Sequence, residues 1–183
     1  MQTRRQIVTG LGSGLALGLV LALAGCGALE PTRLGPATVI EPVAVDEPAM
    51  LARLNAYRAG KGLPPVALDP VLTRVSADMA RYIAERDSMK TRQHSAEGLS
   101  GRLDAAGYRN YAGAENLGAG YASQEAAFAG WQGSAGHDRN LLNPYVTRMG
   151  LARMRRSDGT WRHFWVMTLA RPEADGRPIL VNR

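Results

Sequence analysis

The first half of the chain has two segments in which apolar residues recur at the three- and four-residue spacing of an amphipathic helix. The first, Glu47–Gly60, starts with an acidic residue and a proline, which suit a first helical turn, and ends at a glycine. The second starts at Asp69, whose carboxylate can cap a helix beginning with Pro70, and runs to about Met89. We therefore expect two long helices, each with one apolar face packed against the rest of the fold.

Shorter helices are predicted further along the chain. Ser100 is suited to cap a helix that ends at Ala106, and Ser123 to cap one from Gln124 to about Gln132. A short helical turn is expected at 138–142. The glycine-rich stretch 108–120 between them has no clear period and is expected to be irregular.

The last third of the chain is rich in β-branched and aromatic residues, which favour strands at Val146–Met154 and Thr160–Ala170. The pair Asp158-Gly159 between them is a strong signal for a tight turn, so the two strands should form a hairpin. Helices come first and strands last, without a repeating strand–helix–strand order. This arrangement predicts the α+β class, with residues 47–172 as the folded domain and 173–183 as a peripheral tail.

Residues 1–25 have the layout of an export signal. Arg4 and Arg5 are followed by an apolar run, Ile7–Ala24, and then by small residues before Cys26. A membrane-spanning anchor is the competing interpretation, since the apolar run is close to spanning length. Its glycines, and its end at small residues instead of at a positive flank, favour a cleaved signal.

The segment Leu23-Ala24-Gly25-Cys26 resembles the bacterial lipobox, in which the cysteine becomes the lipidated N-terminus. Cys26 is the only cysteine of the 183 residues, so no disulfide can form within the chain. The proline-containing stretch 26–46 is then expected to be a flexible tether. The resemblance implies an anchor in the cell envelope. Gly27 is not a retention aspartate, which favours an outer membrane.

The two arginines near the start are also similar to a twin-arginine export signal. Cleavage before Cys26 removes both and leaves 20 Lys and Arg against 16 acidic residues, a net charge of +4 instead of +6. The basic residues are scattered and lack interleaved aromatics. No nucleic-acid partner is therefore expected.

Three residues that could carry chemistry, His94, Glu115 and His137, are spread along the chain as expected for a cleft built from several loops. An imidazole can bind a metal or accept a proton near neutral pH, and a carboxylate can orient that imidazole or share the metal. Structural roles are the alternative: a surface His94, a His137 at a helix end, and a Glu115 bonded to backbone amides. Glu125 follows a predicted helix cap, where the helix dipole stabilises a carboxylate.

Taken in order, a set of short motifs resembles the CAP superfamily of cysteine-rich secretory, antigen and pathogenesis-related proteins, in its compact bacterial form. The matching segments lie within 47–172 and are Leu54-Asn55-x-Tyr57-Arg58, Gly62-Leu63-Pro64-Pro65, Arg102-Leu103, Ala106-Gly107-Tyr108, Glu115-Asn116-Leu117, Gly120-Tyr121, Trp131, Gly136-His137-x-Arg139-Asn140-Leu141-Leu142 and Phe164-Trp165-Val166-Met167.

This resemblance implies a three-layer α-β-α sandwich with a central cleft. In the family, two histidines and two glutamates face the cleft, and some members bind zinc there. His94, Glu115 and His137 are carried over as cleft residues and as a hypothetical zinc set, with Glu125 as a weaker fourth ligand. Asn116 adjoins the cleft glutamate, and Ser134 stands where the second glutamate is expected.

The expected function is therefore that of an exported, lipid-anchored domain that binds a ligand or partner at the cleft without catalysing a reaction. Some family members bind sterols or other lipids, which implies an apolar ligand. The alternatives are a zinc-dependent hydrolase or protease using the same cleft, and a structural envelope protein whose partner surface lies elsewhere.

Overall fold

A computed structural model describes residues 37–179 of the chain. Its strands are β1 (Ile40–Pro42), β2 (Ala67–Leu68), β3 (Asn110–Ala119), β4 (Arg148–Arg156) and β5 (His163–Pro172). Its α-helices are α1 (Glu47–Ala59), α2 (Pro70–Glu85), α3 (Ala96–Ala105), α4 (Gln124–Gln132) and α5 (Ala135–Leu141). Two single turns of 3₁₀-helix, η1 (Arg92–His94) and η2 (Glu173–Asp175), complete the described elements.

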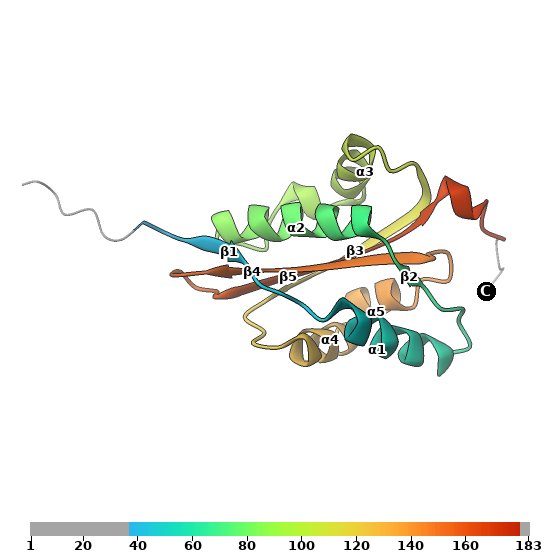
Figure 1. Ribbon diagram of the computed structural model, residues 1–183, viewed down its shortest axis with the longest axis horizontal. Helices are drawn as coiled ribbons and strands as arrows, with labels where there is room; N and C mark the ends of the chain where they lie inside the picture. Colours follow the sequence, from blue (N-terminus) through green and yellow to red (C-terminus); the bar gives the residue numbers. More distant parts are fainter. Residues whose placement is uncertain (1–36, 180–183) are drawn as a thin grey trace, which may run out of the picture. The chain divides into compact units, whose positions relative to one another are not determined.

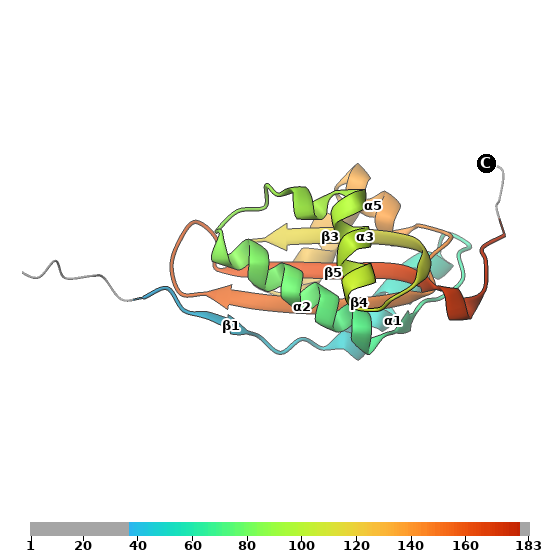
Figure 2. The ribbon, with the colours of Figure 1, turned by 90° about the horizontal axis from the view of Figure 1, so that it is seen from above.

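The strands form one sheet in the order β1-β4-β5-β3, and the short β2 pairs with β4 in parallel. Helices α2 and α3 cover one face of this sheet, and α1, α4 and α5 cover the other (Figure 1). Seen from above, β3 lies at the edge of the sheet beneath α3, and β1 lies at the opposite edge (Figure 2). The α+β class and the three-layer sandwich expected from the sequence are confirmed.

The central strand β5 supplies both cores, because its alternate residues point to opposite faces of the sheet. Trp165 and Met167 pack with the helices α1 and α4, while Phe164 and Val166 pack with α2. All four side chains are fully buried or nearly so. Because helices cover both faces, the sheet holds the neighbouring loops and helix ends in fixed positions. The residues of the site lie on these segments.

The two long helices predicted from apolar spacing are confirmed, with Asp69 capping α2 through the backbone amides of Val71 and Leu72. The predicted cap of α3 was wrong. Ser95, not Ser100, accepts a hydrogen bond from the amide of Gly98, at 3.0 Å, so the helix starts more than one turn earlier than expected. Likewise α5 starts at Ala135 and includes His137, where only a turn from residue 138 was expected.

The largest error of the sequence prediction concerns residues 108–120, which were expected to be irregular. Asn110–Ala119 is strand β3, paired antiparallel with β5 along its whole length. Residues 114–118 are all buried, because helices cover both faces of the strand here. A strand buried on both faces lacks the alternation of polar and apolar residues by which strands are recognised in a sequence.

The start of the folded region also differs from the expectation. Ile40–Pro42, inside the predicted tether 26–46, forms strand β1 and pairs with the end of β4. In the predicted tail, Asp175 accepts hydrogen bonds from Arg148 and Thr147 of the β4 region, so this part is attached to the domain. The expectations for the signal, for Cys26 and for the tether before residue 37 lie outside the described residues.

Candidate functional site

A cleft lies along β3, and residues of η1, of the start of α3 and of α5 line it together with those of the strand. Figure 2 shows that β3 is the edge strand beside α3 and α5. The cleft has a volume of about 210 Å³. Its walls combine one carboxylate, one imidazole and one amide with small and apolar groups: His94, Ser95, Ala96, Leu99, Gly113, Ala114, Glu115 and Asn140.

The cleft contains a direct contact between two of the residues predicted from the sequence. Nδ1 of His94 lies 3.0 Å from Oε2 of Glu115. His94 ends the 3₁₀ turn η1, which the hydroxyl of Thr91 caps, and Glu115 is in the middle of β3. The His94 side chain is one-third exposed (33%), whereas that of Glu115 is almost entirely buried (2%). Glu115 therefore acts from below the surface to fix the ring of His94.

Arg102 of α3 compensates the buried carboxylate. Its Nη2 donates to both oxygens of Glu115, at 2.9 Å each, and also to the backbone carbonyl of Gln93 at 3.1 Å. The guanidinium thus ties α3, η1 and β3 together around one carboxylate. A buried carboxylate with a cationic partner and several hydrogen bonds is stable in its ionised form.

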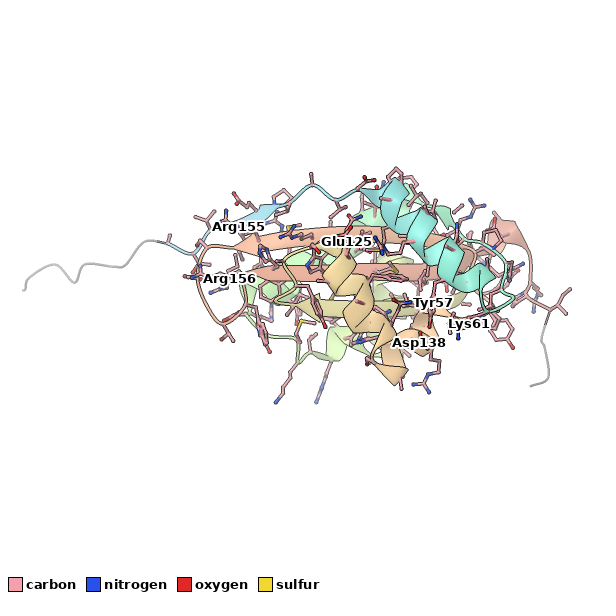
Figure 3. All side chains as sticks on the ribbon, turned by 90° about the horizontal axis from the view of Figure 1, so that it is seen from below. Tyr57, Lys61, Glu125, Asp138, Arg155 and Arg156 are labelled. Atoms are coloured by element: carbon pink, nitrogen blue, oxygen red, sulfur yellow. The ribbon has the colours of Figure 1, made fainter. Side chains whose placement is uncertain are left out.

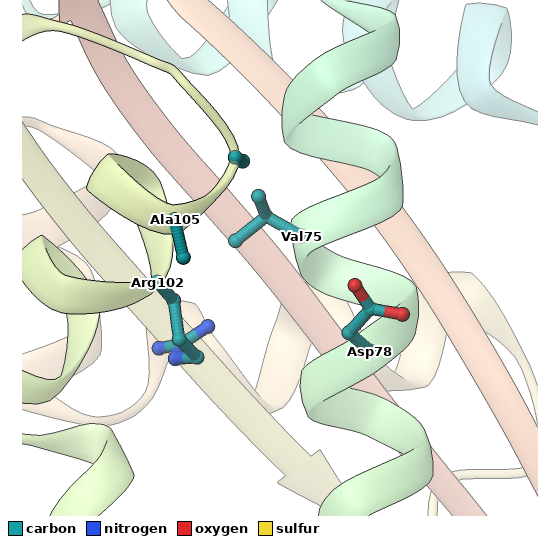
Figure 4. A pocket seen from close by; sticks show the side chains of 5 residues that line it. Val75, Asp78, Arg102 and Ala105 are labelled. Atoms are coloured by element: carbon teal, nitrogen blue, oxygen red, sulfur yellow. The ribbon is translucent and has the colours of Figure 1, made fainter.

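On its other side, Arg102 lines a second, separate cavity of about 200 Å³ between α2 and α3. Asp78 and Val75 of α2 form one wall there, and Arg102 and Ala105 of α3 form the opposite wall (Figure 4). No ion pair between Asp78 and Arg102 is formed among the described residues, so Glu115 is the counter-ion of this guanidinium.

An amide network joins β3 to α5 below the cleft. Asn116 donates from Nδ2 to the carbonyl of His137 at 3.0 Å. Asn140 donates from Nδ2 to the carbonyl of Glu115 and to Oδ1 of Asn116, at 3.0 and 2.9 Å. Trp131 similarly donates to the carbonyl of Leu117. Asn140 and Trp131 thus satisfy two carbonyls of the edge strand β3, which would otherwise remain open to pairing with another strand.

His137 is held near the cleft by this network and by a contact of its helix with α1. Tyr57 donates its hydroxyl proton to Asp138 at 2.7 Å, and the two side chains meet between α1 and α5 (Figure 3). Burial lowers the pKa of His137 below its ordinary value, and the charge of His94 lowers it further. His137 itself does not line the cleft.

The other candidates lie elsewhere. Glu125 is in the first turn of α4, on the face of the sheet opposite α3 (Figure 3). It is exposed and forms a 3.7 Å ion pair with Arg53. Ser134 precedes α5 but makes no capping hydrogen bond with its side chain. His163, at the start of β5, binds Arg153 through Nδ1 at 2.9 Å.

The zinc set suggested by the sequence does not fit this arrangement. Within residues 37–179, no three His, Cys, Asp or Glu side chains are placed so that they could hold one metal ion. Both oxygens of Glu115 are occupied by Arg102, and Nδ1 of His94 points to the same carboxylate. Glu115 therefore serves as the hydrogen-bond partner of an imidazole and a guanidinium in this structure. Glu125 lies on the opposite face of the sheet.

Two residues of the site were not among the candidates from the sequence, Arg102 and Asn140. Both are within the short motifs quoted above, so their signal was present in the Arg102-Leu103 pair and in the segment after His137. Their roles depend on contacts between elements, which no spacing within one element reveals.

The motifs, the fold and the cleft can now be compared with known proteins. The family model described as "Cysteine-rich secretory protein family" (CAP) matches residues 51–169, well over half of the chain. The chain belongs to the CAP family. Its resemblance to this family, seen first in the order of its motifs, is confirmed.

A curated relative is the uncharacterised protein YkwD of Bacillus subtilis, 23% identical over 109 residues. The match covers 60% of this chain but only 42% of YkwD. The chain thus spans less than half the length of the curated relative that it matches.

Solved structures with the same fold come from other bacteria. An extracellular protein containing an SCP domain from Bacillus anthracis is 24% identical, with a TM-score of 0.57 over 68% of this chain and 39% of its own. An outer surface protein of Borrelia burgdorferi is 17% identical, with a TM-score of 0.63 over 73% of this chain and 99% of its own. At these identities the likeness concerns the fold. None of the helices within residues 37–179 has the length and apolar character to cross a bilayer.

Proposed function

We propose that this chain is an exported CAP protein, anchored by lipid at Cys26, whose cleft binds a ligand or partner without catalysing a reaction. The arrangement of His94 and Glu115 carries the proposal. The carboxylate is buried and held by Arg102, while the imidazole is partly exposed at the cleft. Among residues 37–179, Nε2 of His94 has no hydrogen-bond partner, so it is available to a bound group.

This geometry supports binding more than hydrolysis. A general base, or a carboxylate that activates water beside a metal, has to reach the reacting atoms. The side chain of Glu115 is only 2% exposed and both of its oxygens are bonded to Arg102. Glu125, the other carboxylate considered, is on the opposite face of the sheet. His94 is thus the one titratable side chain that Glu115 orients toward the cleft, and it has no second accessible carboxylate of the predicted set beside it, which favours recognition of a bound group over metal-assisted hydrolysis.

The size of the cleft defines the class of ligand. Its volume of about 210 Å³ is below the range of roughly 300–1,000 Å³ that is typical of sites enclosing a whole small molecule. It takes the polar end group of a larger ligand. Nε2 of His94 and the amide oxygen of Asn140 can bond to that group, and Leu99 can contact its apolar part. A lipid or sterol-like molecule would insert its polar end, and a protein partner would insert one side chain.

The test is the capture of envelope components by the mature, lipidated protein in detergent. Wild-type protein is incubated with an envelope lipid extract and with detergent-solubilised envelope proteins, re-purified, and analysed by mass spectrometry. We expect a bound species that is lost from His94→Ala and Asn140→Ala. Glu125→Ala is the matched control, because it removes an exposed carboxylate far from the cleft. Equal capture by all four proteins would exclude the cleft as the binding site.

Two further measurements separate binding from catalysis. Turnover of peptides or esters that disappears in His94→Ala would overturn the non-enzymatic function. Calorimetry with zinc chloride tests the hydrolase alternative. Zinc binding by the wild type that is lost in a His94→Ala/His137→Ala variant would favour a metal-dependent enzyme.

The anchor has its own test. Several acyl chains hold a protein on a membrane where a single chain would bind only marginally. We expect Cys26→Ala to release the protein from the membrane fraction or to leave it unprocessed. Unchanged membrane retention of a processed Cys26→Ala protein would contradict lipid anchoring.

A further inference from the structure

The described chain begins at the end of the sheet where β4 and β5 are joined. Ile40 of β1 pairs with Arg156 at the end of β4, and the amide of Ser157 donates to the carbonyl of Val39 at 2.9 Å. Thr38 donates its hydroxyl proton to Asp158 in the turn. Figures 1 and 2 show β1 running along this end of the sheet, with the C-terminal η2 at the other end. The entry of the chain is therefore fixed to the β4–β5 turn.

The distance along the chain from Cys26 to this point is short. Ala37 is eleven positions after Cys26, and this stretch spans at most about 40 Å even when fully extended. The ten residues of β5 alone extend over about 33 Å. A lipid on Cys26 thus keeps the β4–β5 turn near the bilayer. The opposite end of the sheet could reach the bilayer only if the tether ran back along nearly the whole length of the domain.

The same end exposes Trp161, which is 39% accessible. Trp131 and Trp165 are buried and donate their indole protons to the carbonyls of Leu117 and Tyr121. The indole N–H of Trp161 has no partner among residues 37–179. Its backbone amide is bonded to Asp87 at 3.0 Å, so the ring is presented by a fixed turn.

The surroundings of Trp161 complete a surface suited to lipid headgroups. Val39 is 55% exposed beside the turn. Two acids at this end are already bonded within the fold: Asp87 to backbone amides and Asp158 to Arg156 and Thr38. Arg162 is exposed and forms no ion pair among the described residues. An apolar side chain, an indole with a free N–H and an unpaired cation are the groups that proteins place at a membrane interface.

We propose that Val39, Trp161 and Arg162, the "turn surface", contact the phospholipid headgroup layer of the membrane to which Cys26 is anchored. The inference rests on the lipid anchor proposed above and adds an orientation to it. In this orientation the β4–β5 turn faces the bilayer. The cleft at His94, along the side of the sheet, stays open to solvent. The cleft therefore does not contact the bilayer.

Fluorescence quenching by brominated lipids tests this orientation. The mature lipidated protein is reconstituted into vesicles of phosphatidylethanolamine and phosphatidylglycerol, in which part of the phospholipid carries bromine near the headgroup end of its acyl chains. We expect loss of the emission from Trp161 and a shift of the emission to shorter wavelength. Trp161→Phe should remove the quenched component, because Trp131 and Trp165 are shielded inside the domain.

A second variant provides a matched control. Tyr111 is as exposed as Trp161, at 38% against 39%, but lies at the start of β3, at the far end of the sheet. Emission from the tryptophan in Tyr111→Trp/Trp161→Phe should escape quenching. Flotation of the vesicles shows separately whether the protein is anchored. Anchored protein with no quenching of Trp161, or with equal quenching at both positions, would overturn the orientation. Wild-type protein that fails to float would overturn the anchor itself.

Discussion

His94 and Glu115 are 21 residues apart in the chain, yet Nδ1 of the one lies 3.0 Å from Oε2 of the other. The contact exists because β3 carries Glu115 beneath the loop that ends in η1, and because Arg102 of α3 holds the same carboxylate. His94, Glu115 and Arg102 therefore form one unit, in which a buried carboxylate orients a partly exposed imidazole and the guanidinium of Arg102 neutralises the carboxylate.

The first prediction concerns the ion pair between Arg102 and the buried carboxylate of Glu115. Arg102→Met leaves the carboxylate of Glu115 buried and without its cationic partner, which should lower the free energy of unfolding by about 2–4 kcal/mol at pH 7. Adding Glu115→Gln to Arg102→Met should recover part of this loss, because the buried charge is then absent. Urea denaturation of the single and double variants measures both effects.

A matched ion pair at the surface provides the control. Arg109 bonds to Glu173, but its side chain is 81% exposed, so Arg109→Met should cost far less stability than Arg102→Met. If Arg102→Met and Arg109→Met were equally mild, the carboxylate of Glu115 would not depend on Arg102 for its burial.

The second prediction is the titration of His137. Its pKa lies below the ordinary 6.5, first because of burial and second because of His94. In NMR titrations, His94→Asn should raise the pKa of His137 but leave it below 6.5, since burial is the larger cause. A His163→Asn variant, which removes a histidine bonded to Arg153 away from the cleft, should leave the pKa of His137 unchanged.

The same shift has a consequence for stability. Because the pKa of His137 is lower in the folded state, the unfolded chain takes up its proton first as the pH falls below about 6.5. The free energy of unfolding should therefore decrease below this pH, and His137→Asn should remove that part of the decrease. At pH values well above 6.5 the residue contributes no pH dependence. A wild type and a variant with parallel stability profiles from about pH 7.5 to about pH 5 would contradict the shift.

Much of this fold could be predicted from the sequence, because its helices are amphipathic. Asp69, Pro70 and the apolar spacing after them define α2. Strand β3 could not be predicted, since burial on both faces removed its alternation and left a stretch that looks like a glycine-rich loop. That error matters for function, because β3 is the element that carries Glu115 and Asn116.

Only part of the site could be predicted from the sequence, since Arg102 and Asn140 were not among the candidates and His137 does not line the cleft. His94 and Glu115 were correctly expected to meet. What the sequence could not show is that Arg102 occupies both oxygens of Glu115, which changes the carboxylate from a candidate metal ligand to an orienting group. The role of Glu115 depends on α3 lying over β3, so that Arg102 can reach the carboxylate. Packing over the whole sheet determines that arrangement.

The third prediction concerns acid denaturation. The hydrogen bond from Arg148, together with that from Thr147, lowers the pKa of Asp175 from 3.8 to about 2. The stabilisation is complete above the unfolded pKa and is lost as the pH falls from about 4 to about 2. Asp175→Asn should lower the free energy of unfolding by about 1–2 kcal/mol at about pH 5, allowing for solvent screening, and by much less at about pH 2. Asp104→Asn, at an exposed position of α3, is the control and should have little effect at either pH.

The fourth prediction tests the contact between α2 and β4, which positions the helix layer formed by α2 and α3. A methyl group on Gly150 of β4 would collide with the backbone of Leu72 and Thr73, which cannot move without displacing α2. Gly150→Ala should therefore destabilise the protein by about 1–3 kcal/mol. Gly136 of α5 has no atom within 4 Å of such a methyl group, so Gly136→Ala should stabilise the helix by about 0.5–1 kcal/mol. Thermal and urea denaturation of the two variants should move in opposite directions. A Gly150→Ala protein as stable as the wild type would show that α2 does not lie this close to the sheet.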